Sequence, residues 1–102
     1  MSIEQTRRVY KYTLERAEQQ TISLPAHGHL LKVAMQDGNI CIWWQFTEGY
    51  GMQDFNFLIV GTGHAIPENM SVSYIDSVFD GPFVWHIYIV DTLESIIKKS
   101  FG

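Results

Sequence analysis

Hydrophobic and polar residues alternate along most of the chain, and this period of two is typical of β-strands with one buried face. The alternation recurs in seven short stretches, several of them separated by Gly, Pro, Asp or Asn. We predict strands over residues 10–14, 20–24, 30–36, 40–46, 54–60, 72–79 and 83–90. This pattern predicts a mainly β fold, a single-domain antiparallel β-sandwich or small barrel of about seven strands.

Some stretches predict more than a strand. In residues 30–36 we expect Leu31, Val33 and Met35 to share one face. The turn residues Asp37-Gly38-Asn39 follow, which predicts a β-hairpin with residues 40–46. Residues 83–90 are mostly apolar on both faces, so this strand should be central or covered on both sides. Residues 15–20 could instead form a helical turn, although six residues are too few to hold one by propensity.

The period changes after Asp91 to that of a helix. Leu93, Ile96 and Ile97 would lie on one stripe, which predicts a short C-terminal helix over about residues 92–100. The chain has 102 residues, enough for one hydrophobic core, so we expect a single domain over residues 1–102.

Aromatic residues are numerous for a domain of this size: three Trp, five Tyr and six Phe. Trp43 and Trp44 are adjacent in one predicted strand and must point to opposite faces. One small core has no room for both faces, so we expect a homo-oligomer, with one Trp at a subunit interface or stacked on a planar ligand. Tyr50, in the loop after this strand, is a further exposed ring and a candidate ligand contact.

The formal net charge of −4 disfavours a protein that binds the DNA or RNA backbone. Cys41 is the only cysteine, so a disulfide within the chain is excluded, and we expect a buried thiol and a cytoplasmic location. Met1–Arg8 is polar and the longest apolar run is Ile87–Val90, so neither a signal peptide nor a membrane span is expected.

Gly61-Thr62-Gly63-His64 is the strongest candidate for a ligand site. Two glycines around a hydroxyl residue after a strand could form a nest of N–H groups for a phosphate or carboxylate. Thr62 could add a hydroxyl, and His64 a donor that becomes cationic near neutral pH. The alternative is a tight turn, with glycine supplying a positive φ. The segment lacks the Gly-Lys-Ser/Thr of a Walker loop and the third glycine of a dinucleotide fingerprint.

The four histidines are a second candidate set: His27, His29, His64 and His86. Three converging histidines could hold zinc, but no Cys-x-x-Cys or His-Glu-x-x-His supports a metal or other cofactor, and we expect none. His27 and His29 are expected in a loop after Pro25. His86 lies within an apolar strand, where we expect its ring to bond a backbone carbonyl unless it contacts a ligand.

Acidic and nucleophilic residues give a weaker signal. Glu68, Asp76 and Asp80 have no spacing that fixes a mutual geometry, and Gly-x-Ser-x-Gly is absent. These observations favour a binding module over an enzyme.

Several segments together resemble a family of small proteins of unknown function, about ninety residues long, encoded mainly by bacteriophages and prophages. The resemblance covers about residues 10–90, and this chain has Ala65 where the family pattern has proline. It rests on Lys11-Tyr12-x-Leu14, Gln20-Thr21-Ile22-x-Leu24-Pro25, Leu31-x-Val33, Gln36-x-Gly38, Trp43 or Trp44, Phe57-x-Ile59-Val60-Gly61-Thr62-Gly63-His64-x-Ile66-Pro67, Tyr74-Ile75 and Val84-x-His86-Ile87-Tyr88.

The resemblance implies a phage accessory protein in the host cytoplasm, acting in counter-defence, but brings no reaction. The leading hypothesis is a non-enzymatic protein that sequesters a small anionic signal, such as a cyclic nucleotide, through Gly61–His64, Trp43, Tyr50 and His86. A second hypothesis is an inhibitor of a host protein that acts through an acidic face or the Tyr50 loop. A third is a small phosphoester hydrolase.

Overall fold

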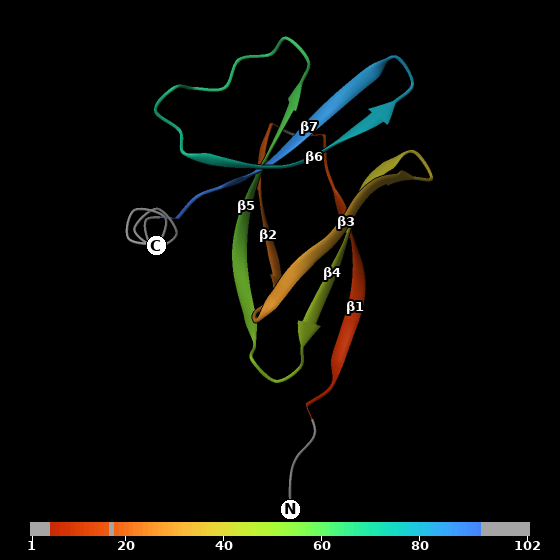
Figure 1. The fold of residues 1–102 in the computed structure, drawn as a ribbon, viewed down its shortest axis with the longest axis vertical. Helices are drawn as coiled ribbons and strands as arrows, with labels where there is room; N and C mark the ends of the chain where they lie inside the picture. Colours follow the sequence, from red (N-terminus) through yellow and green to blue (C-terminus); the bar gives the residue numbers. More distant parts are fainter. Residues whose placement is uncertain (1–4, 17, 93–102) are drawn as a thin grey trace, which may run out of the picture.

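The computed structural model describes residues 5–16 and 18–92, which form two antiparallel β-sheets packed face to face (Figure 1). Sheet A has the order β1-β4-β3, and sheet B has the order β2-β5-β7-β6. The strands are β1 (Arg7–Leu14), β2 (Gln19–Pro25), β3 (Gly28–Gln36), β4 (Asn39–Thr47), β5 (Met52–Gly61), β6 (Val72–Asp80) and β7 (Phe83–Val90). The predicted seven antiparallel strands are confirmed, and they form a sandwich-like pair of sheets instead of a closed barrel.

The predicted helices are not part of the described structure. The C-terminal helix was placed over residues 92–100, and all of these except Thr92 lie outside the described residues. The alternative helical turn at residues 15–20 is wrong, because β2 already begins at Gln19. Among the described residues, no helix has the length and hydropathy that a membrane span needs.

The core lies between the inner faces of the two sheets, and Trp44 is its largest side chain. Its indole N–H donates to the carbonyl oxygen of Pro25 at 2.9 Å, and its ring meets Phe55 edge-on with centroids 5.1 Å apart. Trp44 therefore joins β4 to the crossover after β2 and to β5 in the other sheet. The other fully packed core residues are Leu14, Leu24, Val33, Ile40, Ile42, Phe46, Phe57, Ile59, Val78 and Ile87.

A β-bulge in β3 changes which side chains of this strand face the core, compared with the prediction. Leu30 pairs with Trp44 and Lys32 pairs with Trp43, so Leu31 has no partner of its own. Leu31 is consequently 49% exposed, while Leu30 packs against the core. The prediction that Leu31 shares one face with Val33 and Met35 is therefore wrong, because the extra residue shifts the alternation by one position.

Three other local predictions are confirmed. Asp37 and Gly38 have φ values of 51° and 76°, the pair of positive angles that a type I′ hairpin turn requires. β7 lies between β5 and β6, so it is a central strand of sheet B. Cys41 is buried, with 2% of its surface exposed.

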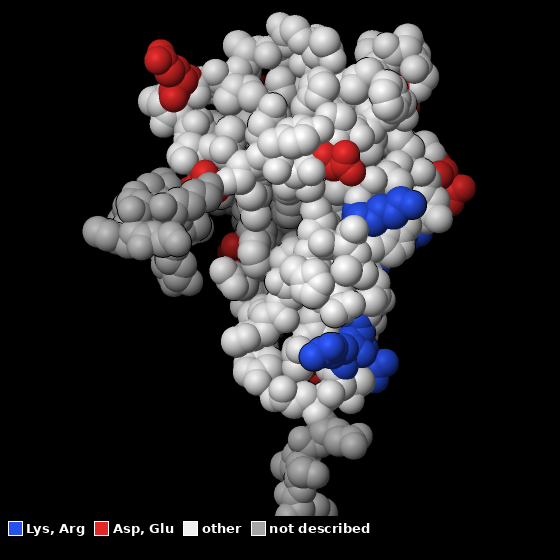
Figure 2. Space-filling model, viewed as in Figure 1, with Lys and Arg blue, Asp and Glu red and all other residues white. Residues whose placement is uncertain are grey.

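Charged residues are unevenly distributed between the sheets (Figure 2). The strands of sheet A contain Arg7, Arg8, Lys11 and Lys32 and no Asp or Glu. Asp54, Asp76 and Asp80 lie on the strands of sheet B. The strands of sheet A are therefore positively charged, although the net charge of the whole chain is negative.

We expect Gly28→Ala to lower the free energy of unfolding by about 1–3 kcal/mol, because it overfills the space beside Trp44. A Cβ on Gly28 would lie 2.3 Å from the indole nitrogen of Trp44. Urea unfolding followed by circular dichroism measures the change. Ser23→Ala, at an exposed position of β2, is the control and should change the value by less than about 0.5 kcal/mol. Equal midpoints for Gly28→Ala and the wild type would contradict the expectation.

Candidate functional site

The Gly61–His64 segment is a tight turn at the end of β5. The His64 N–H donates to the Gly61 carbonyl at 3.0 Å, and Gly63 supplies a φ of 89°. This is the turn geometry that the sequence offered as the alternative to an anion nest. The Thr62 N–H donates to the Val84 carbonyl at 3.3 Å, so two N–H groups of the turn are already used within the protein. For a ligand, the turn presents mainly the Thr62 hydroxyl and the His64 imidazole.

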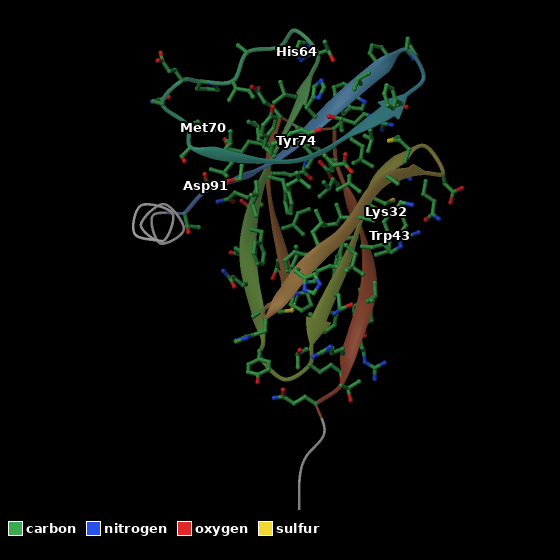
Figure 3. All side chains as sticks on the ribbon, in the orientation of Figure 1. Lys32, Trp43, His64, Met70, Tyr74 and Asp91 are labelled. Atoms are coloured by element: carbon green, nitrogen blue, oxygen red, sulfur yellow. The ribbon has the colours of Figure 1, made fainter. Side chains whose placement is uncertain are left out.

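Gly61 lets the His64 ring lie against the end of the strand. A Cβ at Gly61 would be 3.1 Å from two atoms of the His64 ring and 3.3 Å from Cζ3 of Trp85. Any side chain here would press on both rings. The glycine thus brings the imidazole and the indole to the same end of sheet B, where His64 is exposed (Figure 3).

A chain of hydrogen bonds runs from the turn across the outer face of sheet B. Thr62 Oγ1 lies 2.8 Å from Nε2 of His86, and His86 Nδ1 lies 2.7 Å from Oγ of Ser77. Ser77 Oγ in turn lies 2.6 Å from the hydroxyl of Tyr74. The expectation that His86 bonds a backbone carbonyl is therefore wrong, since both ring nitrogens face side-chain hydroxyls.

The hydrogen-bond chain runs from Thr62 through His86 and Ser77 to Tyr74, and its chemistry depends on which groups donate. A neutral imidazole carries one N–H, so the tautomer of His86 sets the direction of its hydrogen bonds with Thr62 and Ser77. Ser77 lies within reach of a base, as a nucleophile would. However, the third group on His86 is the Thr62 hydroxyl, whereas in a Ser-His-Asp triad a carboxylate stabilises the imidazolium. The arrangement orients hydroxyl groups more than it activates a nucleophile.

On the other side of the turn, side chains enclose a hollow of about 420 Å³. His64, Trp85 and Arg16 line it, together with Glu18, Ile59, Val60 and Ala65. We call this the Trp85 hollow. It combines an aromatic ring with a guanidinium and an imidazole, the groups that stack on planar molecules and bind anions.

Asp80 holds two walls of the Trp85 hollow in place. Its Oδ2 accepts a hydrogen bond from Trp85 Nε1 at 3.0 Å and one from Arg16 Nε at 3.0 Å. Arg16 also donates to the carbonyl of Gly38 at 2.6 Å, so it connects the hairpin turns of both sheets. The hydrogen bonds from Trp85 and then Arg16 keep the pKa of Asp80 below its usual value of 3.8.

The structure separates the other predicted site residues. Trp43 lies on the outer face of sheet A, on the opposite side of the sandwich from His86. Tyr50 lies in the β4–β5 loop, at the far end of the molecule from His64 (Figure 1). Its ring stacks on His27 with centroids 3.9 Å apart, and its hydroxyl accepts a hydrogen bond from Gln5. Of the predicted site residues, only those of the Gly61–His64 turn and His86 are connected by a hydrogen bond.

The histidines do not converge either. His27 lies between β2 and β3, and His29, which was expected in the same loop, lies within β3. Among the described residues, no group of three or more His, Cys, Asp or Glu side chains is placed to hold a metal ion.

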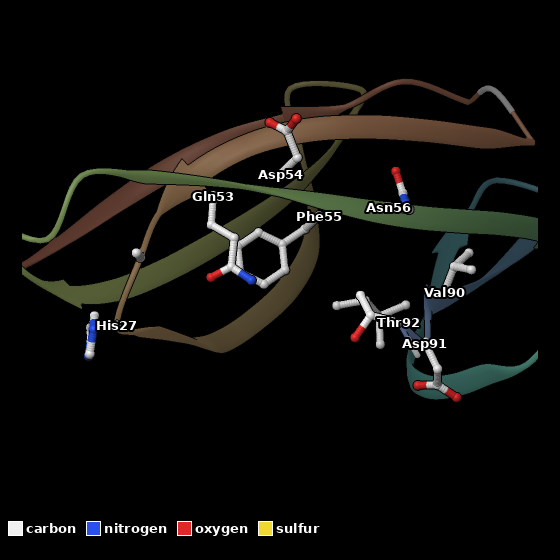
Figure 4. Close-up of a pocket in the computed structure, with 10 residues that line it drawn as sticks. His27, Gln53, Asp54, Phe55, Asn56, Val90, Asp91 and Thr92 are labelled. Carbon is white, nitrogen blue, oxygen red and sulfur yellow. The ribbon is translucent and has the colours of Figure 1, made fainter. Parts of the chain in front are cut away.

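A larger hollow of about 560 Å³ lies where β5 runs past the end of β7 (Figure 4). Asp54 and Asp91 line it, and the ten lining residues that the structure describes include no Lys or Arg. The Asp91 carboxylate also accepts hydrogen bonds from Ser71 and Ser73. Its chemistry therefore suits an anionic ligand less well than that of the Trp85 hollow.

A family model described as a domain of unknown function (DUF7352) matches residues 5–96. The chain belongs to the DUF7352 family. No curated protein and no solved structure matches it. The predicted membership of a family of unknown function is thus confirmed, and the geometry of the site is the main guide to what this DUF7352 domain does.

Sequence reasoning missed Ser77 and Arg16 in this DUF7352 domain, and it did not connect the candidate ring Tyr74 with His86. Tyr74 and Ser77 are three apart, so regular alternation would place them on opposite faces. A bulge at Ile75 brings them to the same face. Arg16 and Asp80 are 64 positions apart, and no local signal pairs them.

We expect Asp80→Asn to weaken the acid-induced loss of stability in this DUF7352 domain. A carboxyl with a lowered pKa stabilises the fold above its unfolded pKa, and this contribution is lost as the pH falls through the folded pKa. The wild type should therefore lose stability below about pH 4 partly through Asp80, and the variant should not. Thermal melting between pH 7 and pH 2 measures this, with Asp54→Asn as the control for a lost negative charge. Parallel curves for Asp80→Asn and the wild type would refute the role of Asp80.

Proposed function

We propose that this chain is a non-enzymatic binding protein that captures a small anionic ligand of the nucleotide type. The observation that carries the proposal is the Trp85 hollow, where Trp85, Arg16 and His64 lie around one space. An indole face suits a base, and the two basic groups suit a phosphate. The volume of about 420 Å³ falls in the range of roughly 300–1,000 Å³ that is usual for small-molecule sites.

The proposal places the ligand beside the Gly61–His64 turn. The His64 ring would turn toward the phosphate and donate a hydrogen bond to it, since it is exposed. Thr62 and His86 would orient the turn from the outer face through their hydrogen bond. Trp43 and Tyr50 belong to other surfaces of the same chain and are not part of this site.

We further propose that the protein acts as a homo-oligomer. Phe79 and Phe83, on either side of the β6–β7 turn, are 78% and 58% exposed, and Phe83 stacks on Trp85 at 5.9 Å. Phe83 lies beside Trp85, whereas Phe79 pairs with Val84 and is exposed on the outer face of the same hairpin, with His86. Exposed rings on both faces of this end of sheet B suit a contact with a second copy. The same rings would serve the alternative function, inhibition of a host protein.

The biological setting that we propose is counter-defence by a phage in the host cytoplasm. It is supported by the resemblance of the signature segments, above all Phe57–Pro67, to a phage-encoded family. A sequestered signal would be a cyclic dinucleotide or an ADP-ribose-type molecule, both of which combine planar bases with phosphates.

Binding is tested by calorimetric titration of cyclic dinucleotides, ADP-ribose and related nucleotides. We expect one of them to bind, and His64→Ala and Arg16→Gln each to weaken that binding at least about 10-fold, through loss of a charged contact. His29→Ala, which changes a histidine on sheet A, is the matched control. Because Arg16 also bonds Asp80, the melting temperature of Arg16→Gln is recorded alongside. A folded protein that binds nothing in this panel would exclude the proposal.

The hydrolase alternative rests on the 2.7 Å contact between Ser77 and His86. Mass spectrometry of the ligand recovered after heat denaturation separates the two functions. Sequestration predicts intact ligand. Turnover that disappears in Ser77→Ala would establish the hydrolase instead.

Oligomerisation is tested by sedimentation equilibrium at micromolar concentration. We expect a mass of at least twice 11.8 kDa for the wild type. Phe79→Asp should shift the protein toward the monomer, because a buried unpaired charge opposes association. Leu31→Asp, which adds the same single negative charge at an exposed apolar position of sheet A, controls for charge alone. A monomeric wild type would contradict the oligomer.

A further inference from the structure

The outer face of sheet A is a second surface, which the proposed function leaves unused. Trp43 lies at its centre, on the middle strand β4. The register places Lys11 of β1 and Lys32 of β3 directly opposite Trp43, one on each side. Residues that face each other in an antiparallel pair point to the same side of the sheet. We call this surface the Trp43 face.

The Trp43 face is positively charged in a chain whose net charge is negative. Arg7 pairs with Thr47 and adds a third cation to the same side of the sheet. The three strands contain no acidic residue; Glu15, Asp37 and Glu48 come only where the strands end. Glu48 forms an ion pair with Arg8, whose side chain is on the other face. Figure 2 shows the basic residues gathered over β1 and β3.

The side chains of the Trp43 face are held across the sheet. Lys11 Nζ donates to Oε1 of Gln36 at 2.6 Å, which spans β4 from one edge strand to the other. Trp43 is partly exposed between them, and the labelled side chains of Lys32 and Trp43 lie next to each other (Figure 3). The face thus offers one aromatic ring with a cation on either side.

We propose that the Trp43 face binds a short single-stranded nucleic acid. One base stacks on Trp43, and Lys11, Lys32 and Arg7 contact phosphates on either side of it. Aromatic rings set among cations on an open sheet are the usual platform for single strands, because every base has a face that can stack. The negative charge of the whole chain predicted against binding of a nucleic-acid backbone, but the charge of this face is opposite.

Charge complementarity decides against the other occupants. A symmetric contact between two copies through this face would set Lys11 and Lys32 against the same cations, and like charges repel. An acidic protein would satisfy the lysines but has no particular need of an indole between them. A duplex would present phosphates without an accessible base face to Trp43.

The test is fluorescence anisotropy of labelled twelve-nucleotide oligothymidine and oligouridine, which separates DNA from RNA. We expect binding at 50 mM NaCl, with a slope of log K against log salt of about −2 for three phosphate contacts. Trp43→Ala should weaken binding about 5- to 150-fold, which corresponds to the loss of one stacked base. The double variant Lys11→Gln, Lys32→Gln should reduce the slope by about 1.4.

Two measurements keep the result interpretable. Trp43→Phe retains a ring and should bind more tightly than Trp43→Ala, but without the quenching of tryptophan fluorescence that we expect of the wild type. Tyr74→Ala, on the outer face of sheet B, should bind like the wild type. No binding by the folded wild type, or equal binding by Trp43→Ala, would overturn the proposal. So would poly-L-glutamate competing as well as the oligonucleotides, since this would point to an acidic protein.

Discussion

The buried indole of Trp44 is the constraint on which the arrangement of the two sheets depends. It fills the space between them, and its N–H satisfies the Pro25 carbonyl at the crossover from β2 to β3. The ring needs the bare backbone of Gly28, where no side chain would fit. Because consecutive residues of a strand point to opposite faces, a buried Trp44 obliges Trp43 to face outward. The burial of Trp44 in the core thereby places Trp43 at the centre of an exposed surface.

In a two-layer sandwich the outer faces of the two sheets lie on opposite sides of the molecule. Residues on these two faces therefore cannot form one site within a single chain. The turn at Gly61–His64 and His86 belong to sheet B, whereas Trp43 belongs to sheet A. Asp80 adds a further link at one end, where it ties Trp85 and Arg16 together and so shapes the Trp85 hollow. The sequence motifs that looked like parts of one site therefore serve separate surfaces, one concave and one flat.

Alternation and turn residues were enough to predict all seven strands and the Asp37-Gly38 hairpin. These signals are local: a period of two reports which face is buried, and two positive φ values need residues such as Asp and Gly. The predicted turn at Gly61–His64 is present, but the partners of its side chains were not predictable. Arg16, Asp80 and Trp85 meet through the packing of distant strands, and no spacing within the sequence encodes that contact.

The Trp43 face and the hydrogen-bond chain through His86 each depend on a single extra residue in an edge strand, which alternation cannot foresee. In β3 the bulge at Leu31 turns Leu30 inward and Lys32 outward, although regular alternation would place them on one face. In β6 the bulge at Ile75 brings Tyr74 and Ser77 to the same face, beside His86. Without the first bulge Trp43 would lose the cation on one side, and without the second His86 would lose its Ser77 partner. The two bulges therefore determine which polar side chains lie beside Trp43 and beside His86.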